Sequence, residues 1–223
     1  YTQKGDVIKP QYAIQRLYEA TRNLDDVFIT TEVGQHQMWA AQFYGFEEPN
    51  RWMTSGGLGT MGYGLPSAMG VQVAHPDALV IDIAGEASVI MNIQEMSTIA
   101  QYRLPVKVFL LNNEYMGMVR QWQTLFYNER YSNTNLQRHG GPVRIPDFVK
   151  LADAYGCVGL ACDSADDVDA TIEKAMEIDD VPVVVDFRVH RDAMVWPMVA
   201  AGTSNDEIKY ARDLAPEWEE DEL

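Results

Sequence analysis

One stretch of the sequence restricts the fold more than any other: two short apolar runs that flank a helical segment. Residues 78–83 form the first run, which stops at Gly85, and residues 106–111 form the second, which ends at Asn112-Asn113. Runs of this length bounded by turn residues are typical of buried strands. The stretch therefore predicts a β-α-β unit of a parallel sheet, with Gly85 and the asparagines at the carboxyl ends of neighbouring strands.

The segment between these strands is predicted to be a helix. Ser88 and Asn92 are both candidate N-caps for it. Its apolar face comprises Ile93, Met96, Ile99 and Ala100. A helix that begins soon after a strand points backbone N–H groups at the strand end, which favours an anion there.

The remaining segments continue the alternation of strands and helices. Strands are expected at residues 27–31, 157–162 and 181–187, helices at 10–23, from Pro66, at 146–155 and at 164–178, and a surface loop at 133–143. This order predicts an α/β fold, a doubly wound parallel sheet with helices on both faces. We assign residues 1–208 to this domain and residues 209–223 to an acidic C-terminal tail.

Charge and composition disfavour several classes of protein. The net charge of −16 argues against binding to nucleic acid or to an anionic membrane. The apolar runs are far shorter than the ~20 residues of a membrane span, and no apolar signal segment follows the first residues. We therefore expect a cytoplasmic protein. Cys157 and Cys162 have no Cys or His at metal-ligand spacing and are expected to be reduced, buried thiols.

Glu86 and Asn113 place a carboxylate and an amide at adjacent strand ends. Both offer the oxygen ligands that Mg²⁺ prefers, and Mg²⁺ commonly completes its shell with substrate phosphates. The pair therefore suggests a diphosphate bridged by a metal ion. The alternative is that Gly85 is an ordinary turn and that Asn112-Asn113 is a polar strand end.

Two further clusters lie where a ligand would bind. His36 follows the strand at 27–31, within Gly34-Gln35-His36-Gln37, and five glycines occur within residues 56–64. Polar residues at a strand's carboxyl end and glycines that admit close backbone approach are both typical of binding loops. A histidine of no special role and close helix packing are the alternatives that the residues alone leave open.

Together the motifs resemble those of thiamine diphosphate enzymes, and in particular those of the acetohydroxyacid synthase (acetolactate synthase) family. Residues 85–113 resemble the diphosphate-binding fingerprint Gly-Asp-Gly…Asn-Asn, with Glu86 in place of Asp and Ala87 in place of Gly. Residues 33–42 and 114–122 resemble signatures of the synthase itself. The change at Glu86 adds one methylene to a metal ligand, which bears on affinity and metal choice.

The resemblance implies a role for each motif. Glu86, Asn113 and the backbone carbonyl of Tyr115 would bind Mg²⁺, and Met61 would keep the cofactor bent. The implied cofactor-binding residues are Gln35, His36, Gly59, Met61, Gly85, Ala87, Ser88, Gly117 and Met118. The implied pocket for the second 2-keto acid is lined by Met118, Val119 and Trp122. Residues 193–199 resemble a C-terminal segment that folds back over the site.

The resemblance extends over residues 9–208 and implies a function. The family condenses pyruvate with a second pyruvate or with 2-ketobutyrate, with loss of CO₂, in branched-chain amino acid biosynthesis. Its other domains supply an activating glutamate and bind FAD. Because this sequence starts at the family's third domain, we expect a fragment of a longer protein, or one half of a split enzyme, that is inactive alone and carries no catalytic residue.

Two other classes of function remain open. One is a different thiamine diphosphate enzyme, such as a pyruvate oxidase or a 2-keto acid decarboxylase, which residues 35–39 and 118–122 disfavour. The other is a non-catalytic domain, which only Glu86 favours. As partners, the resemblance implies 2-keto acid substrates and a homo-oligomer built on dimers, and a regulatory subunit is a further candidate.

Overall fold

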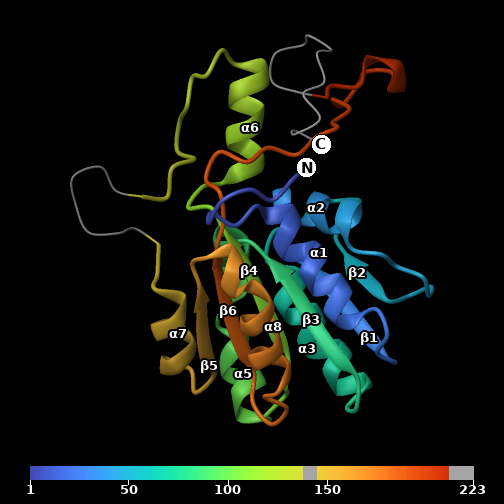
Figure 1. Ribbon diagram of the computed structural model, residues 1–223, viewed down its shortest axis with the longest axis vertical. Coiled ribbons are helices and arrows are strands. Elements are labelled where there is room, and N and C mark those ends of the chain that lie inside the picture. Colours follow the sequence, from blue (N-terminus) through green and yellow to red (C-terminus); the bar gives the residue numbers. More distant parts are fainter. Residues whose placement is uncertain (138–144, 211–223) are drawn as a thin grey trace.

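A computed structural model describes residues 1–137 and 145–210 of the chain. At its centre is a six-stranded sheet in the order β2-β1-β3-β4-β6-β5, in which every pair of neighbours is parallel (Figure 1). The strands are β1 (Val27–Thr31), β2 (Trp52–Thr54), β3 (Leu79–Ala84), β4 (Lys107–Asn112), β5 (Val158–Cys162) and β6 (Val183–Arg188). The predicted parallel sheet is confirmed.

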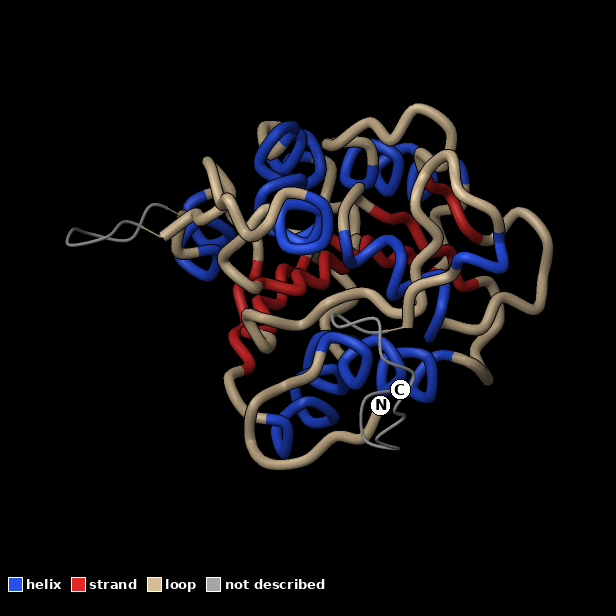
Figure 2. Tube along the Cα trace, turned by 90° about the horizontal axis from the view of Figure 1, so that it is seen from above, coloured by secondary structure: helices blue, strands red, loops and turns tan. Residues whose placement is uncertain are grey.

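Helices cover both faces of this sheet, as Figure 2 shows from above. One face is covered by α1 (Pro10–Thr21), α2 (Gln35–Phe43) and α8 (Val168–Met176), and the other by α3 (Gly64–Ala74), α5 (Glu95–Gln101) and α7 (Phe148–Ala154). The short α4 (Glu86–Val89) follows β3, and α6 (Gly117–Phe126) stands beyond the carboxyl end of β4 (Figure 1). The doubly wound arrangement is therefore confirmed as well.

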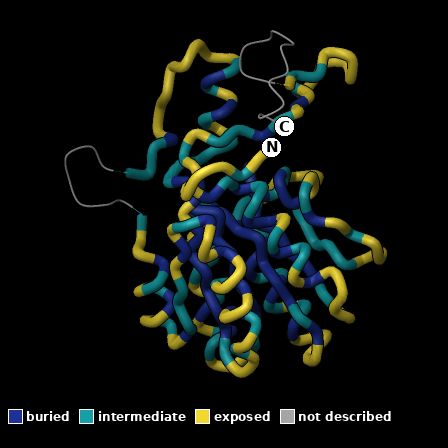
Figure 3. Tube along the Cα trace, in the orientation of Figure 1, coloured by how far each residue is buried: buried dark blue, intermediate teal, exposed yellow. Residues whose placement is uncertain are grey.

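The strands are apolar almost throughout because both faces of the sheet are buried. Alternate residues of β3 belong to different cores: Ile81 and Ile83 pack toward α1, α2 and α8, whereas Val80 packs toward α3 and α5. Figure 3 shows the central strands as the most buried part of the molecule. A rigid sheet of this kind fixes the positions of the loops that leave its strands.

The connections of β1 and β3 create the place where ligands bind in such folds. After β1 the chain runs to β2 on one side of the sheet, and after β3 it runs to β4 on the other side. The two strands are neighbours and end level with each other, with Thr31 beside Ile83. Neighbouring strands whose connections diverge leave a crevice at their carboxyl ends.

Several local predictions were wrong. Neither Ser88 nor Asn92 is an N-cap: α4 begins directly after Gly85, residues 90–92 form a 3₁₀ turn, and α5 begins after Gln94 without a side-chain cap. The edge strand β2 was not predicted. The helix expected from Pro66 begins two residues earlier, at Gly64.

The surface loop expected at residues 133–143 is only partly correct. Residues 134–136 lie beside residues 114–116, since the Met116 amide donates to the Thr134 carbonyl at 2.9 Å and the Leu136 amide to the Glu114 carbonyl at 3.0 Å. Residues 138–143 lie outside the described part of the chain. This contact fixes the loop that follows Asn113.

Three further predictions concern cysteines, membranes and the C-terminus. Cys157 and Cys162 are free and buried, as predicted. Within the described residues, no helix is long and apolar enough to cross a membrane. Met198 and Lys209 exchange backbone hydrogen bonds of 2.8 Å. Residues 211–223 of the predicted acidic tail lie outside the described ranges.

Candidate functional site

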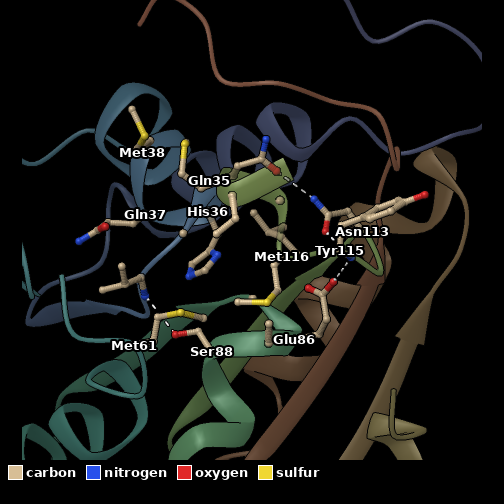
Figure 4. A pocket seen from close by; sticks show the side chains of 18 of the residues that line it. Gln35, His36, Gln37, Met38, Met61, Glu86, Ser88, Asn113, Tyr115 and Met116 are labelled. Atoms are coloured by element: carbon tan, nitrogen blue, oxygen red, sulfur yellow. Dashed lines mark hydrogen bonds between the residues drawn. The ribbon is translucent and has the colours of Figure 1, made fainter. Parts of the chain in front are cut away.

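A cavity of about 250 Å³ opens beyond the carboxyl ends of β1, β3 and β4 (Figure 4). Its lining comes from the segments that follow these strands and from the glycine-rich loop. The lining residues are those at positions 33–39, 59, 61, 85–88, 111, 113 and 115–119. The structure thus brings together every residue predicted to contact cofactor or metal. Of the predicted substrate pocket, Met118 and Val119 line the cavity as well.

Glu86 and Asn113 converge on one backbone amide. The Tyr115 amide donates to Glu86 Oε1 at 2.8 Å and to Asn113 Oδ1 at 3.1 Å. Glu86 is the first residue of α4 and is 2% exposed. Burial raises the pKa of its carboxyl group to about 8, against the opposing effect of the Tyr115 amide. A cation beside this carboxyl would favour the ionised form.

His36 places an imidazole in the middle of the cavity (Figure 4). The ring packs so closely on Gly34 and Gly85 that a Cβ on Gly85 would lie 2.5 Å from Nδ1. Burial lowers the pKa of His36 to about 3, so the ring is neutral. Its Nε2 is buried and has no hydrogen-bond partner among the described residues. An unpaired buried polar atom is costly, and a phosphate oxygen at this point would satisfy it in the tautomer that carries the single imidazole proton on Nε2.

Gln35 is buried next to Asn113 at the start of α2. The Asn113 Nδ2 group donates to Gln35 Oε1 at 3.0 Å. A Cβ on Gly117, the first residue of α6, would lie 2.0 Å from that oxygen, so a side chain there would displace the Gln35 amide. The Gln35 Nε2 group is engaged as well, by Gln121 Oε1 and by the Ala193 carbonyl. A direct contact of this side chain with a ligand would replace one of these bonds, and its cofactor role stays a prediction.

The glycine-rich loop reaches the cavity at Gly59 and Met61. Gly59 and Gly62 have φ values of +66° and +84°, which favour glycine. In Figure 4 Met61 and Ser88 lie below His36, whereas Glu86 lies to its right, close to Asn113 and Tyr115. The cavity therefore has a carboxylate end at Glu86 and a sulfur-lined end at Met61.

Trp122 does not line this cavity. It lies on an outer face of α6, is 45% exposed, and meets Phe126 edge to face with 6.3 Å between ring centroids. Val119 is 47% exposed and borders both the cavity and this face. Trp122 is therefore not part of the core, whereas Met118 packs against it.

Three residues at the site were missed by reasoning from the motifs. Met116 lines the cavity beside His36 (Figure 4). Glu32 and Gln121 are buried just outside the lining and bind the segments that form it. Glu32 carried a signal, because a carboxylate that directly follows an apolar strand is expected to be buried with a specific partner. Gln121 carried none.

With this geometry in view, comparison with known proteins defines the class. A family model described as "Thiamine pyrophosphate enzyme, C-terminal TPP binding domain" matches residues 32–187, a range that contains the whole lining of the cavity. The chain therefore belongs to the family of thiamine pyrophosphate enzymes, as a TPP-binding domain.

The particular relatives are acetolactate synthases. The chain is 54% identical over 214 residues to the acetolactate synthase large subunit of Mycobacterium tuberculosis, 49% over 220 residues to that of Corynebacterium glutamicum, and 44% over 210 residues to the isozyme 3 large subunit of Escherichia coli. These matches cover 93–99% of this chain but 34–35% of each relative. The chain thus spans about a third of the length of the curated relatives it matches.

Proposed function

We propose that the chain is the cofactor-binding part of an acetolactate synthase, which condenses two 2-keto acids with loss of CO₂ in branched-chain amino acid biosynthesis. The observation that carries this proposal is the convergence of Glu86 and Asn113 on the Tyr115 amide, inside the region that the family model matches. The identity to acetolactate synthases over nearly the whole chain supports this choice among thiamine pyrophosphate enzymes.

Mg²⁺ fits the ligands available at this end of the cavity. Glu86 and Asn113 supply a carboxylate and an amide oxygen, and the Tyr115 carbonyl is a further candidate ligand. Among the described residues no group of three or more His, Cys, Asp or Glu side chains could hold a metal ion. A site with the single carboxylate of Glu86 suits Mg²⁺, which is usually bound by one or two carboxylates together with phosphates and water.

The other lining residues have roles that follow from their chemistry. When bound, thiamine diphosphate supplies carbanion stabilisation. The unpaired Nε2 of His36 would bind a diphosphate oxygen. Helices α4 and α6 begin at Glu86 and Gly117, and the backbone amides of their first turns would also face the diphosphate. Gly59 and Met61 would contact the rings at the other end of the cavity.

The exposed face of α6 is proposed to serve substrate and partners. Val119, Trp122 and Phe126 leave much of their apolar surface exposed, although α6 is otherwise anchored by buried Gln121 and Thr124. An exposed apolar cluster beside a cavity is typical of a surface that another domain, subunit or substrate covers. We therefore propose that the second 2-keto acid binds at this face of α6. The complete enzyme would supply FAD, a second catalytic copy and a regulatory subunit.

A chimera tests this function directly. The chain replaces the matched region of the M. tuberculosis large subunit, and acetolactate formation from pyruvate is measured with and without thiamine diphosphate and Mg²⁺. We expect acetolactate that depends on both, while the isolated chain makes none. Acetaldehyde as the sole product would favour a decarboxylase, and a folded, cofactor-binding chimera without turnover would favour a non-catalytic domain.

A further inference from the structure

Glu32 is a fully buried carboxylate that lies just behind the cavity wall. It follows β1 directly and has no exposed surface. Its Oε1 accepts from the Leu65 amide at 2.9 Å, and its Oε2 accepts from the Gly62 amide and from the Ser88 hydroxyl, both at 2.7 Å. All of these donors are neutral. A buried carboxylate of this kind is tolerated only because its oxygens are hydrogen-bonded.

A second buried carboxyl group, that of Asp82, interacts with Glu32. Asp82 lies on β3 and accepts from the Thr30 hydroxyl at 2.8 Å. Burial, and next the charge of Glu32, raise the pKa of Asp82 far above its ordinary value. Two buried carboxyl groups at close range do not both ionise.

The carboxyl group of Glu32 lies at the start of α3, where it accepts from the Leu65 amide. Leu65 is in the first turn of this helix, where backbone amides have no partner within the helix. Tyr63 occupies the N-cap position but provides no side-chain cap. Glu32 therefore caps α3 from another segment of the chain.

The same carboxylate fixes the glycine-rich loop. Gly62 lies two residues before α3 and is hydrogen-bonded through both of its backbone groups: its amide donates to Glu32 and its carbonyl accepts from Asn92. The preceding residues, 56–60, are exposed, and nothing lies within 4 Å of where a Cβ on Gly57 would be. The base of the loop is thus the part that determines where Gly59 and Met61 lie.

Ser88, in the segment after β3, connects Glu32 to the glycine-rich loop and to the segment after β1. Its hydroxyl donates to Glu32 and accepts from the amides of Gly62 and Val33, each at 3.2 Å. Val33, Met61 and Ser88 all line the cavity. The base of the glycine-rich loop is therefore held against the segments after β1 and β3.

We propose that Glu32 is a positioning residue that places Gly59 and Met61 against the ring end of the cofactor, without acting on the diphosphate end. This inference rests on the proposed function. Glu32 itself is turned away from the cavity and is absent from its lining. Its loss should therefore weaken the binding of ligands that reach the glycine-rich loop and spare ligands that occupy only the end at Glu86.

The test compares two ligands on the 223-residue chain, thiamine diphosphate and inorganic pyrophosphate, each titrated calorimetrically with Mg²⁺. Glu32→Gln keeps the size of the side chain but replaces one accepting oxygen by an NH₂ group that faces donors. We expect its affinity for thiamine diphosphate to fall by about tenfold or more and its affinity for pyrophosphate to stay within about twofold. Glu32→Asp should recover part of the loss, and Glu173→Gln on the exposed side of α8 is the matched control.

Hydrogen exchange of the same variants separates positioning from unfolding. In Glu32→Gln the Gly62 and Leu65 amides should exchange faster, while amides of β4 keep their protection. An equal loss of both ligands, or no loss of either, would overturn the inference and leave the proposed function standing. If the unsubstituted chain bound neither ligand, the inference and the proposed function would both be wrong. If Glu32→Gln did not fold, Glu32→Asp would decide by the same ratio of affinities, since it keeps the carboxyl group but shortens the side chain by one methylene.

Discussion

The side-chain amides of Gln35 and Gln121 are hydrogen-bonded at the back of the cavity, with Gln35 Nε2 donating to Gln121 Oε1 at 2.9 Å. Gln35 also accepts from Asn113, and Gln121 binds both the amide and the carbonyl of Val195, at 2.8 and 2.9 Å. A continuous row of amides therefore runs from a predicted metal ligand to residues 193–195. Residues 193–195 belong to the segment predicted to fold over the site. They are held there by hydrogen bonds to Gln35 and Gln121.

Replacing Gln121 should loosen this segment. Gln121→Ala leaves the buried amide and carbonyl of Val195 without partners, so we expect a loss of about 1–3 kcal/mol in the free energy of unfolding. Hydrogen exchange at residues 193–198 should accelerate more than exchange in β4. Gln101→Ala, at the exposed end of α5, is the control. Unchanged exchange at residues 193–198 would show that the segment is fixed by other contacts.

The pKa of Glu86 predicts a pH dependence for the metal-free chain. Its folded-state value of about 8 lies above the ordinary 4.5, so between these pH values folding takes up a proton. The contribution of Glu86 to stability is therefore complete below pH 4.5 and is lost as the pH rises toward 8, by up to about 1.4 kcal/mol per pH unit. Glu86→Gln removes this term, and the variant should gain stability relative to the parent chain from pH 5 to 8. Parallel pH profiles of urea unfolding for the two proteins would contradict the assignment.

A side chain at Gly117 is predicted to disturb Gln35. In Gly117→Ala the new Cβ would lie 2.0 Å from Gln35 Oε1, which forces Gln35 or α6 to move and should weaken cofactor binding by at least about tenfold. Gly70→Ala is the matched control, because nothing lies within 4 Å of that position in α3, and it should stabilise the chain by about 0.5–1 kcal/mol. Calorimetric titration and thermal unfolding measure both effects. Normal binding by Gly117→Ala would mean that Gln35 is free to move.

The selectivity between keto acids is predicted to depend on Trp122. In the chimera, Trp122→Leu should reduce the preference for 2-ketobutyrate over pyruvate by about 1–3 kcal/mol while turnover is kept, because a pocket discriminates one methylene by no more than that. The stability should change little, since Trp122 is half exposed. Competition between the two keto acids gives the ratio. An unchanged ratio would remove Trp122 from the substrate pocket.

The sheet and most of the lining could be predicted because they depend on local patterns. Residues 27–31 read as an apolar strand and are one, and Glu86 and Asn113 lie together because parallel strands end at the same edge. The three-residue β2 could not be predicted, since it is short, half-buried and stabilised by pairing with β1 rather than by its own pattern.

The supporting residues could not be predicted for a different reason. Ser88 was expected to cap a helix, but its hydroxyl is used by Glu32 and by two backbone amides from distant segments. Gln121 looks in sequence like any polar residue of an amphipathic helix, and its burial follows from residues 193–195, more than 70 positions away. Long-range hydrogen bonds leave no periodic signal along the chain.

The most direct test of the account is a calorimetric titration of the chain with thiamine diphosphate, with Mg²⁺ and with EDTA, for the parent chain and for Glu86→Gln. We predict weak, saturable binding that requires Mg²⁺ and falls by about tenfold or more in Glu86→Gln, because the variant keeps the shape of the side chain but loses the charge that binds the metal. Binding that is unaffected by EDTA, or equally strong in Glu86→Gln, would contradict the placement of a metal-bridged diphosphate between Glu86 and Asn113.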